Sequence, residues 1–223
     1  MRRTMVDDVD ARVLPNLLAW YRAETVVGKF GDGQSALYAL DESGHGNNLG
    51  GGGTVPLMNY AVCNGYAAYK FTGAMDLRNA NVTFTSSVAG AFAVVKHTVA
   101  GNFAAGGGGG EGIITDYGST NGSLRGDASV SNIFDNTATY TAYVNGVATK
   151  VIANTNAWNL LYIEFTSGKQ SYTGTMMGRH GTGATFLTGS IVECGYFGNL
   201  PTSGQRTAFF NAMIAKYNIT GVP

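Results

Sequence analysis

Two glutamates stand where a carboxylate could take part in acid–base chemistry. Glu164 and Glu193 are each the single charge in an apolar run, in WNLLYIEFT and in GSIVECGYF. Enzymes that cleave glycosidic bonds use two carboxyl groups, about 5–5.5 Å apart in the retaining class. Neither run offers a second carboxylate two residues away, on the same face of an extended strand. We therefore expect both glutamates to be hydrogen-bonded structural residues, and we expect that the chain is not an enzyme.

A polar loop offers the first candidate ligand-binding residues. The segment DESGHGNNL contains two glycines and several short polar side chains. Asp and Asn side chains commonly bond the backbone of such a turn, and their oxygens can also bind Ca²⁺. We expect a turn stabilised by its own side chains, with a Ca²⁺ site as the alternative and no other cofactor. The candidate residues in this loop are Asp41, His45, Asn47 and Asn48.

A second polar loop, GRHGTG, adds Arg179 and His180 as candidates for ligand binding. Glycine-rich loops on a rigid scaffold are frequent binding elements. The chain's three histidines are far apart in the sequence, and neither Cys63 nor Cys194 has the spacing of a metal ligand, so we expect no transition-metal site. Both cysteines are expected to be buried free thiols.

The elements that must position these residues are mostly strands. Residues 139–144 alternate in polarity and are followed by Asn145-Gly146, the usual sequence of a type I′ hairpin turn. Residues 91–98 and 158–166 are further strand-like runs. Thirty-three glycines among 223 residues favour many short strands joined by turns over a helical bundle.

One buried strand and one helix are predicted near the end of the chain. Residues 189–197 are apolar on both faces, which predicts a strand inside a sheet that is covered on both sides. Thr202 and Gln205 have the spacing of a capping box. Residues 209–217 then place apolar side chains along one stripe of a helix, and Asn218 favours a left-handed end to it.

The order of these segments resembles that of concanavalin A-like, laminin G-like lectin and glucanase domains. The matching C-terminal residues are Phe186, Gly189, Ile191, Glu193, Leu200, Gln205, Arg206, Ala215, Lys216, Tyr217 and Ile219. The opening strand around Trp20 and the loop at residues 41–48 resemble the same family. The resemblance implies an all-β fold, a concanavalin A-like jelly-roll β-sandwich with a C-terminal α-helix, over residues 14–223. Glucanases of this fold carry their carboxylates as E-x-D-x-x-E, a string that this sequence lacks.

Bulk composition argues against two classes of partner. Fourteen basic and fourteen acidic residues cancel, so net charge favours neither nucleic acid nor an anionic membrane. No run approaches the ~20 apolar residues of a membrane-spanning helix. The N-terminal residues lack the apolar core of a secretion signal. We expect synthesis and folding in a cytoplasm, with no nucleic-acid and no membrane partner.

These features together favour binding or structure over catalysis. We expect a non-catalytic virion structural protein, of the bacteriophage capsid-decoration or fibre type, with a lectin-like domain that binds host-surface glycans. Its partners would be other virion proteins or further copies of itself, and a surface polysaccharide. Its location would be the virion. Two alternatives stay open: a carbohydrate-binding module of a secreted bacterial system, located outside the cell, and a glycanase or lyase with a non-standard site.

Residues 1–13 are expected to form an N-terminal arm. The segment MRRTMVDDVDARV is dense in charge and has too few apolar residues to order itself. We expect it to attach the protein to a larger assembly through arginines and small apolar anchors, with an ordinary frayed terminus as the alternative. The candidate assembly residues are Arg2, Arg3, Met5, Val6 and Val9.

Overall fold

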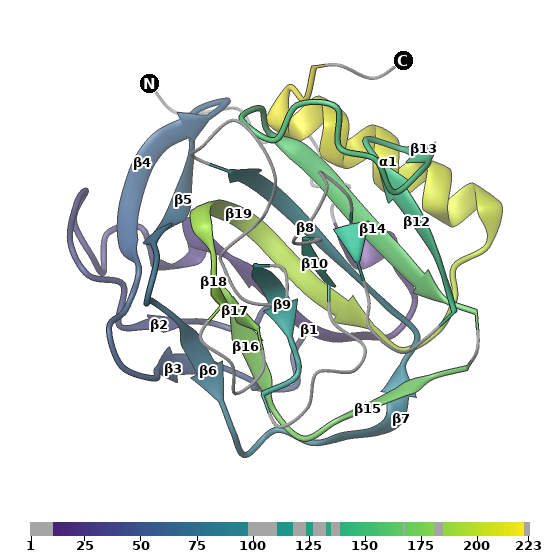
Figure 1. The fold of residues 1–223 in the computed structure, drawn as a ribbon, viewed down its shortest axis with the longest axis horizontal. Coiled ribbons are helices and arrows are strands. Elements are labelled where there is room, and N and C mark those ends of the chain that lie inside the picture. The colour runs from purple at the N-terminus through teal and green to yellow at the C-terminus, as the bar shows by residue number, and fades with distance from the viewer. Residues whose placement is uncertain are drawn as a thin grey trace.

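The computed structural model describes residues 11–97, 111–117, 124–126, 133–134, 139–166, 168–180 and 185–220. Within these ranges the chain is an all-β sandwich with one α-helix, as the sequence predicts. Two antiparallel sheets lie face to face, and the helix covers the outer face of the larger one (Figure 1). The all-β fold class is therefore confirmed.

The larger sheet is built around one long strand. Its strands, in spatial order, are β13 (Val147–Ala148), β12 (Tyr140–Val144), β14 (Asn159–Phe165), β8 (Gly90–His97), β19 (Thr188–Phe197), β5 (Tyr66–Thr72) and β4 (Leu57–Cys63). An eighth strand, β1 (Leu17–Arg22), pairs with the last part of β19, beyond the part that pairs with β5. β19 thus lies inside the sheet, as residues 189–197 predict.

The smaller sheet consists of seven short strands in the described part of the chain. In spatial order they are β11 (Ile133–Phe134), β10 (Leu124–Gly126), β9 (Gly112–Thr115), β16 (Thr175–Met177), β6 (Leu77–Asn79), β3 (Leu49–Gly51) and β2 (Tyr38–Ala39). Two strand pairs complete the β structure: β7 (Phe84–Val88) with β15 (Gln170–Tyr172), and β17 (Arg179–His180) with β18 (Thr185–Phe186). The short helices η1 (Ala11–Val13) and η2 (Ala23–Val26) flank β1.

Both faces of the larger sheet are buried. On β19, Ile191 and Tyr196 point into the core between the two sheets. Val192 and Phe197 point the other way, into a second core under the helix α1 (Ser203–Tyr217). This alternation between two cores explains why the strand is apolar on both faces.

Local sequence determines the turn and the helix ends. Asn145 and Gly146 have φ angles of 52° and 84°, as a type I′ turn requires. Thr202 and Gln205 form the predicted capping box, and Asn218 ends the helix with φ 48°.

No helix in the described ranges is long and apolar enough to cross a membrane.

The predicted arm lies outside the described residues except for its last three. Those three form η1, whose Ala11 is fully buried in the core under α1. The candidate residues Arg2, Arg3, Met5, Val6 and Val9 belong to the part that is not described, as does the run of five glycines at residues 106–110. The division into an arm and a domain stays a prediction.

Candidate functional site

The two glutamates singled out by the sequence are structural. Glu193 is fully buried and accepts hydrogen bonds from Trp20 Nε1 at 2.7 Å and Lys216 Nζ at 2.9 Å. Glu164 accepts from Tyr162 Oη at 2.9 Å and forms an ion pair with Arg206 at 2.7 Å. Lys216 and Arg206 belong to α1, so each glutamate fastens the helix to the larger sheet.

The loop around Asp41 is a turn held by its own polar groups. Asp41 Oδ1 accepts hydrogen bonds from the backbone N–H groups of Trp20 and Ser43, both at 2.9 Å. Its Oδ2 accepts from Ser43 Oγ and from the Asn47 N–H, both at 2.8 Å. Both carboxylate oxygens are therefore occupied by protein donors, and the predicted side-chain-stabilised turn is confirmed.

The other loop candidates serve the same turn or lie at its tip. Asn48 Oδ1 accepts from the Asp41 N–H at 2.8 Å, and Asn47 Nδ2 donates to the Leu18 carbonyl at 2.8 Å. His45 is exposed. No group of three or more His, Cys, Asp or Glu side chains in the described ranges could hold a metal ion.

The two cysteines are buried free thiols, as expected. Burial raises the pKa of Cys63 to about 12 and raises the pKa of Cys194 as well. Since the thiolate is the nucleophile, neither cysteine is suited to covalent catalysis at neutral pH.

A set of charged side chains, made up of three groups of contacting residues, lies around β17. We call it the β17 row; it comprises His97, Glu111, Arg125, His180, Arg179, Asp76 and Arg78. His97 ends β8, Arg179 and His180 form β17, Arg125 and Arg78 lie within β10 and β6, and Glu111 and Asp76 directly precede β9 and β6. The row contains two buried carboxylates, on Asp76 and Glu111, in addition to the cations and histidines.

Close packing of β17 against β9 brings the row together. The Gly178 N–H donates to the Ile113 carbonyl at 3.0 Å, and Thr115 Oγ1 donates to the Arg179 carbonyl at 2.8 Å. A Cβ atom on Gly112 would lie only 2.1 Å from that same carbonyl oxygen. Glycine at residue 112 is therefore needed for the two backbones to approach.

His97 and Glu111 form the first pair of the row. His97 Nε2 lies 2.9 Å from Glu111 Oε2, and both side chains are 4% exposed. The Thr188 N–H donates to the same carboxylate oxygen at 3.1 Å. Because His97 ends β8 and Thr188 begins β19, this pair joins the larger sheet to the smaller one.

Arg125 and His180 form the second pair. Arg125 Nη1 donates to His180 Nε2 at 2.6 Å, and Arg125 is 2% exposed. The β10–β9 register sets Arg125 opposite Gly112, the residue after Glu111. The backbone that carries the second pair therefore runs beside the backbone next to Glu111.

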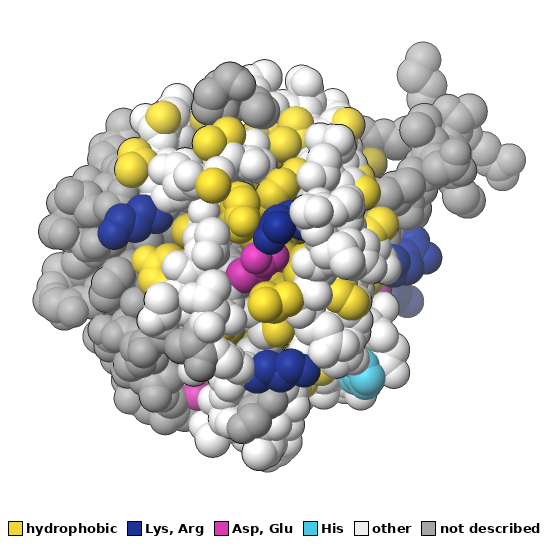
Figure 2. All heavy atoms as spheres, turned by 90° about the vertical axis from the view of Figure 1, so that its right-hand side faces the viewer, with side chains coloured by type: hydrophobic (Ala, Val, Ile, Leu, Met, Phe, Trp, Pro, Cys, Tyr) yellow, Lys and Arg dark blue, Asp and Glu magenta, His cyan; other side chains and the backbone are white. Residues whose placement is uncertain are grey.

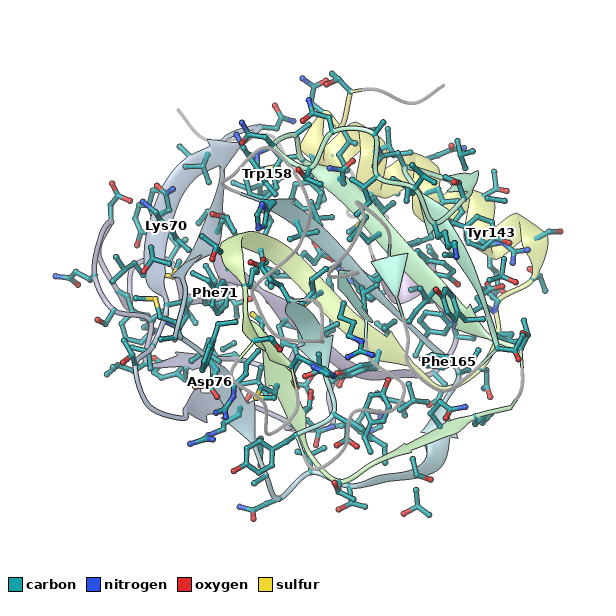
Figure 3. The ribbon with its side chains drawn as sticks, viewed as in Figure 1. Lys70, Phe71, Asp76, Tyr143, Trp158 and Phe165 are labelled. Carbon is teal, nitrogen blue, oxygen red and sulfur yellow. The ribbon has the colours of Figure 1, made fainter. Side chains whose placement is uncertain are left out.

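Asp76 lies between two arginines at the other end of the row. Its Oδ2 is 3.8 Å from Arg78 Nε and 3.7 Å from Arg179 Nη1, too far for hydrogen bonds. The two guanidinium groups lie over the rings of Tyr117 and Phe186, at 5.2 and 5.1 Å from the ring centres. Figure 3 shows Asp76 beside β6 and below Phe71.

This arrangement suits a hydroxylated ligand. A hydroxyl group can donate to a carboxylate and at the same time accept from a guanidinium. Asp76 Oδ2 forms no hydrogen bond with either arginine, because the nearest guanidinium nitrogens are 3.7 and 3.8 Å away. The His97–Glu111 pair adds two groups that can take up or release a proton.

Sequence reasoning identified two members of the row, Arg179 and His180, and missed the rest. Asp76, Glu111 and Arg125 come from three separate segments, so no spacing along the chain relates them. The signal for Glu111 is weak: it is a lone acid between a glycine run and an apolar strand. The candidates of the first loop lie elsewhere, and no hydrogen bond or ion pair between described residues joins them to Arg179 or His180.

Comparison with known proteins finds arabinofuranosidases among solved structures. One is a mutant GH54 α-L-arabinofuranosidase soaked with 4-nitrophenyl α-L-arabinofuranoside, at 15% identity and a TM-score of 0.47 over 94% of this chain. Another is an arabinofuranosidase complexed with arabinofuranosyl-α-1,2-xylobiose, at 16% identity and a TM-score of 0.45 over 92%. This chain covers 61% and 60% of those two chains, less than two thirds of their length. No family model and no curated protein matches it.

These neighbours correct two expectations drawn from the sequence. We expected a non-catalytic virion structural protein and no enzyme activity. The solved structures found are glycoside hydrolases rather than virion structural proteins, so neither expectation is kept. None of the three is a phage or virion protein.

Proposed function

We propose that this chain is a glycoside-cleaving enzyme whose reaction centre is the β17 row. The observation that carries the proposal is the Glu111–His97 contact of 2.9 Å in a buried site. Glu164 and Glu193 are buried as well, but their ion-pair partners are an arginine and a lysine. Glu111 is paired with a histidine, a side chain that exchanges its proton near neutral pH.

In this proposal Glu111 and His97 do the acid–base work. A group in that position would protonate the glycosidic oxygen as the bond to the sugar breaks, and would later take a proton from the attacking water. The Thr188 N–H, at 3.1 Å, holds the Glu111 carboxylate in a fixed orientation. Glu111 and His97 are each about 3% exposed, so the pair is largely shielded from bulk water.

Asp76 and its two arginines bind the sugar in this proposal. A sugar hydroxyl that bridges Asp76 and Arg78 from one side would donate to the carboxylate and accept from the guanidinium. The half-buried rings of Tyr117 and Phe186 hold the arginines in place through cation–π contact. The same feature favours a second candidate function, carbohydrate binding without cleavage.

The test is hydrolysis of a panel of 4-nitrophenyl glycosides, starting with the α-L-arabinofuranoside that was soaked into one solved neighbour. We expect release of 4-nitrophenol from at least one substrate. Glu111→Gln should lower kcat/KM by about 100-fold or more, because it removes a general acid–base group. The matched control is Glu164→Gln, another buried and ion-paired glutamate, which should leave kcat/KM unchanged.

Two results would decide against the proposal, the first against cleavage itself and the second against the assigned reaction centre. If no glycoside is cleaved but a polysaccharide is bound in a manner that requires Asp76, the second candidate replaces the first. If cleavage occurs and Glu111→Gln has no more effect than Glu164→Gln, the reaction centre lies elsewhere.

A further inference from the structure

A separate groove lies at the edge of the larger sheet, where the β12–β13 hairpin opens. The two strands pair only at Tyr143 with Ala148 and at Val144 with Val147, while β12 continues back to Tyr140. Beyond the last pair the strands diverge. Residues 139–142 and 148–150 line the resulting groove, which has a volume of about 450 Å³. That volume falls within the usual range of small-ligand sites.

The lining of the groove is rich in hydroxyl groups. Thr139, Thr141 and Thr149 each contribute a hydroxyl that can both donate and accept a hydrogen bond. Lys150 adds three donors, and no carboxylate lines the groove. The chemistry therefore matches a ligand that carries many hydroxyl groups and no positive charge.

The groove lies away from the Asp76 end of the β17 row (Figure 3). Tyr140 pairs with Phe165 of β14, and Figure 3 shows Phe165 and Tyr143 on the side of the molecule opposite Asp76. Figure 2 looks onto the side that carries β12 and α1, where charged side chains are scattered among apolar and uncharged polar atoms. A neutral ligand is compatible with such a surface.

We infer that this groove binds a neutral saccharide and holds a polysaccharide on the protein while the β17 row acts at another point. The choice of a saccharide rests on the proposed function together with the hydroxyl lining. Binding in the groove does not itself require cleavage, so the two can be tested separately. A site that holds the polysaccharide on the protein would raise the effective concentration of the polysaccharide at the reaction centre.

The experiment is affinity electrophoresis in gels that contain soluble arabinoxylan, mixed-linkage β-glucan or starch. We expect at least one polysaccharide to retard the protein. The double variant Thr141→Val and Thr149→Val keeps the β-branched shape and removes two hydroxyls. Because it removes two hydrogen-bonding groups, it should weaken binding by about tenfold. The matched control is Thr85→Val, an exposed threonine of β7.

The proposal about the groove and the proposal of enzyme activity can be disproved separately. If the double variant still cleaves an aryl glycoside at the wild-type rate but is no longer retarded, both proposals stand. If the wild type is retarded but cleaves no glycoside, and the double variant is not retarded, the groove proposal is supported and the enzyme proposal is rejected. The inference about the groove is overturned if no polysaccharide retards the wild type, or if the double variant and Thr85→Val are retarded as strongly as the wild type while their melting temperatures match.

Discussion

At the scale of single residues, the partners of a buried carboxylate indicate its role. Glu193 is fully enclosed by donors from β1 and α1, including the Lys216 ammonium at 2.9 Å. A carboxylate bound in this way has no position left for a substrate. Glu111 instead faces His97, at a point where three polypeptide segments meet. Burial alone would not separate these two glutamates.

Glu193→Gln is predicted to destabilise the protein. The substitution would leave Lys216, whose side chain is 10% exposed, without its counter-charge. Removing one partner of a buried ion pair costs about 3–5 kcal/mol, which for a chain of this length lowers the melting temperature by roughly 6–20 °C. Thermal unfolding followed by circular dichroism measures this. The control is Glu42→Gln, whose ion pair with Arg22 is about one-fifth exposed and should contribute less than about 1 kcal/mol. Equal melting temperatures for the two variants would contradict the structural role of Glu193.

The sequence predicts structural residues better than it predicts the β17 row. A lone glutamate in a strand that is apolar on both faces must find buried donors, and for Glu193 it does. Asp76 meets Arg179, and Arg125 meets His180, only because β17 comes close to segments that are distant in the sequence. Proximity of this kind depends on the order of the strands in the sheets, which cannot be predicted from the spacing of residues along the sequence.

At the scale of elements, the β17 row depends on the approach of β17 to β9. The Gly112 position lies against the backbone of Arg179 and His180, so no side chain fits between the two segments. Gly178 has φ 84° and faces the ring of Phe71, which lets the chain turn from β16 into β17. These two glycines place Arg179 beside Asp76 and His180 beside Arg125.

Gly112→Ala is predicted to separate β17 from β9 and to abolish activity. The added Cβ would clash with backbone atoms, and overpacking of this kind costs about 1–3 kcal/mol. The control is Gly50→Ala in β3 of the same sheet, where an added Cβ meets nothing within 4 Å. Thermal unfolding and glycoside hydrolysis of both variants provide the test. A Gly112→Ala protein with wild-type activity would show that the row is not the reaction centre.

Elements with strong local signals are the ones that the sequence predicts. The Asn145-Gly146 turn, the Thr202 capping box and strand β19 all appear where expected. Strands of two or three residues, such as β10, β11 and β17, are too short to show an alternating pattern. Most of the smaller sheet consists of such strands, and it is this sheet that carries the β17 row.

At the scale of the whole molecule, the two cores bury many ionisable groups in their neutral form. Burial raises the pKa values of Tyr21, Tyr69, Tyr162, Tyr196, Tyr217 and Cys194 above their usual range, and raises that of Cys63 to about 12. In the unfolded chain the same groups lose their protons near pH 9–10. The folded state therefore binds more protons than the unfolded state above that pH.

Stability is accordingly predicted to fall with rising pH. The contribution of these groups to the free energy of unfolding is fully present below about pH 9. Above that pH, each group lowers the free energy of unfolding by about 1.4 kcal/mol per pH unit until its folded-state pKa is reached. Melting temperatures measured between pH 8 and pH 11 should fall steeply above about pH 9. Tyrosinate absorbance should appear together with unfolding rather than before it. Ionisation of all twelve tyrosines in a protein that remains folded would contradict the burial of these rings.

The whole molecule also shows what a fold-level resemblance can supply. The jelly-roll likeness predicts the sandwich and its C-terminal helix, which the structure has. It does not determine the function, because one fold hosts lectins, structural proteins and enzymes alike. The expectation of no catalysis rested on a carboxylate string along one strand, whereas the carboxylates of the β17 row come from different strands.

The central claim is that Glu111 acts on the substrate and does not merely hold the fold. The most direct measurement is chemical rescue of Glu111→Ala by formate, a small carboxylate that can enter the space left by the missing side chain. We predict that Glu111→Ala lowers the hydrolysis rate by about 100-fold or more and that added formate restores part of it. The control Glu164→Ala should keep the wild-type rate and should not respond to formate. A folded Glu111→Ala protein that keeps the wild-type rate, or one whose lost rate formate does not restore, would contradict the claim.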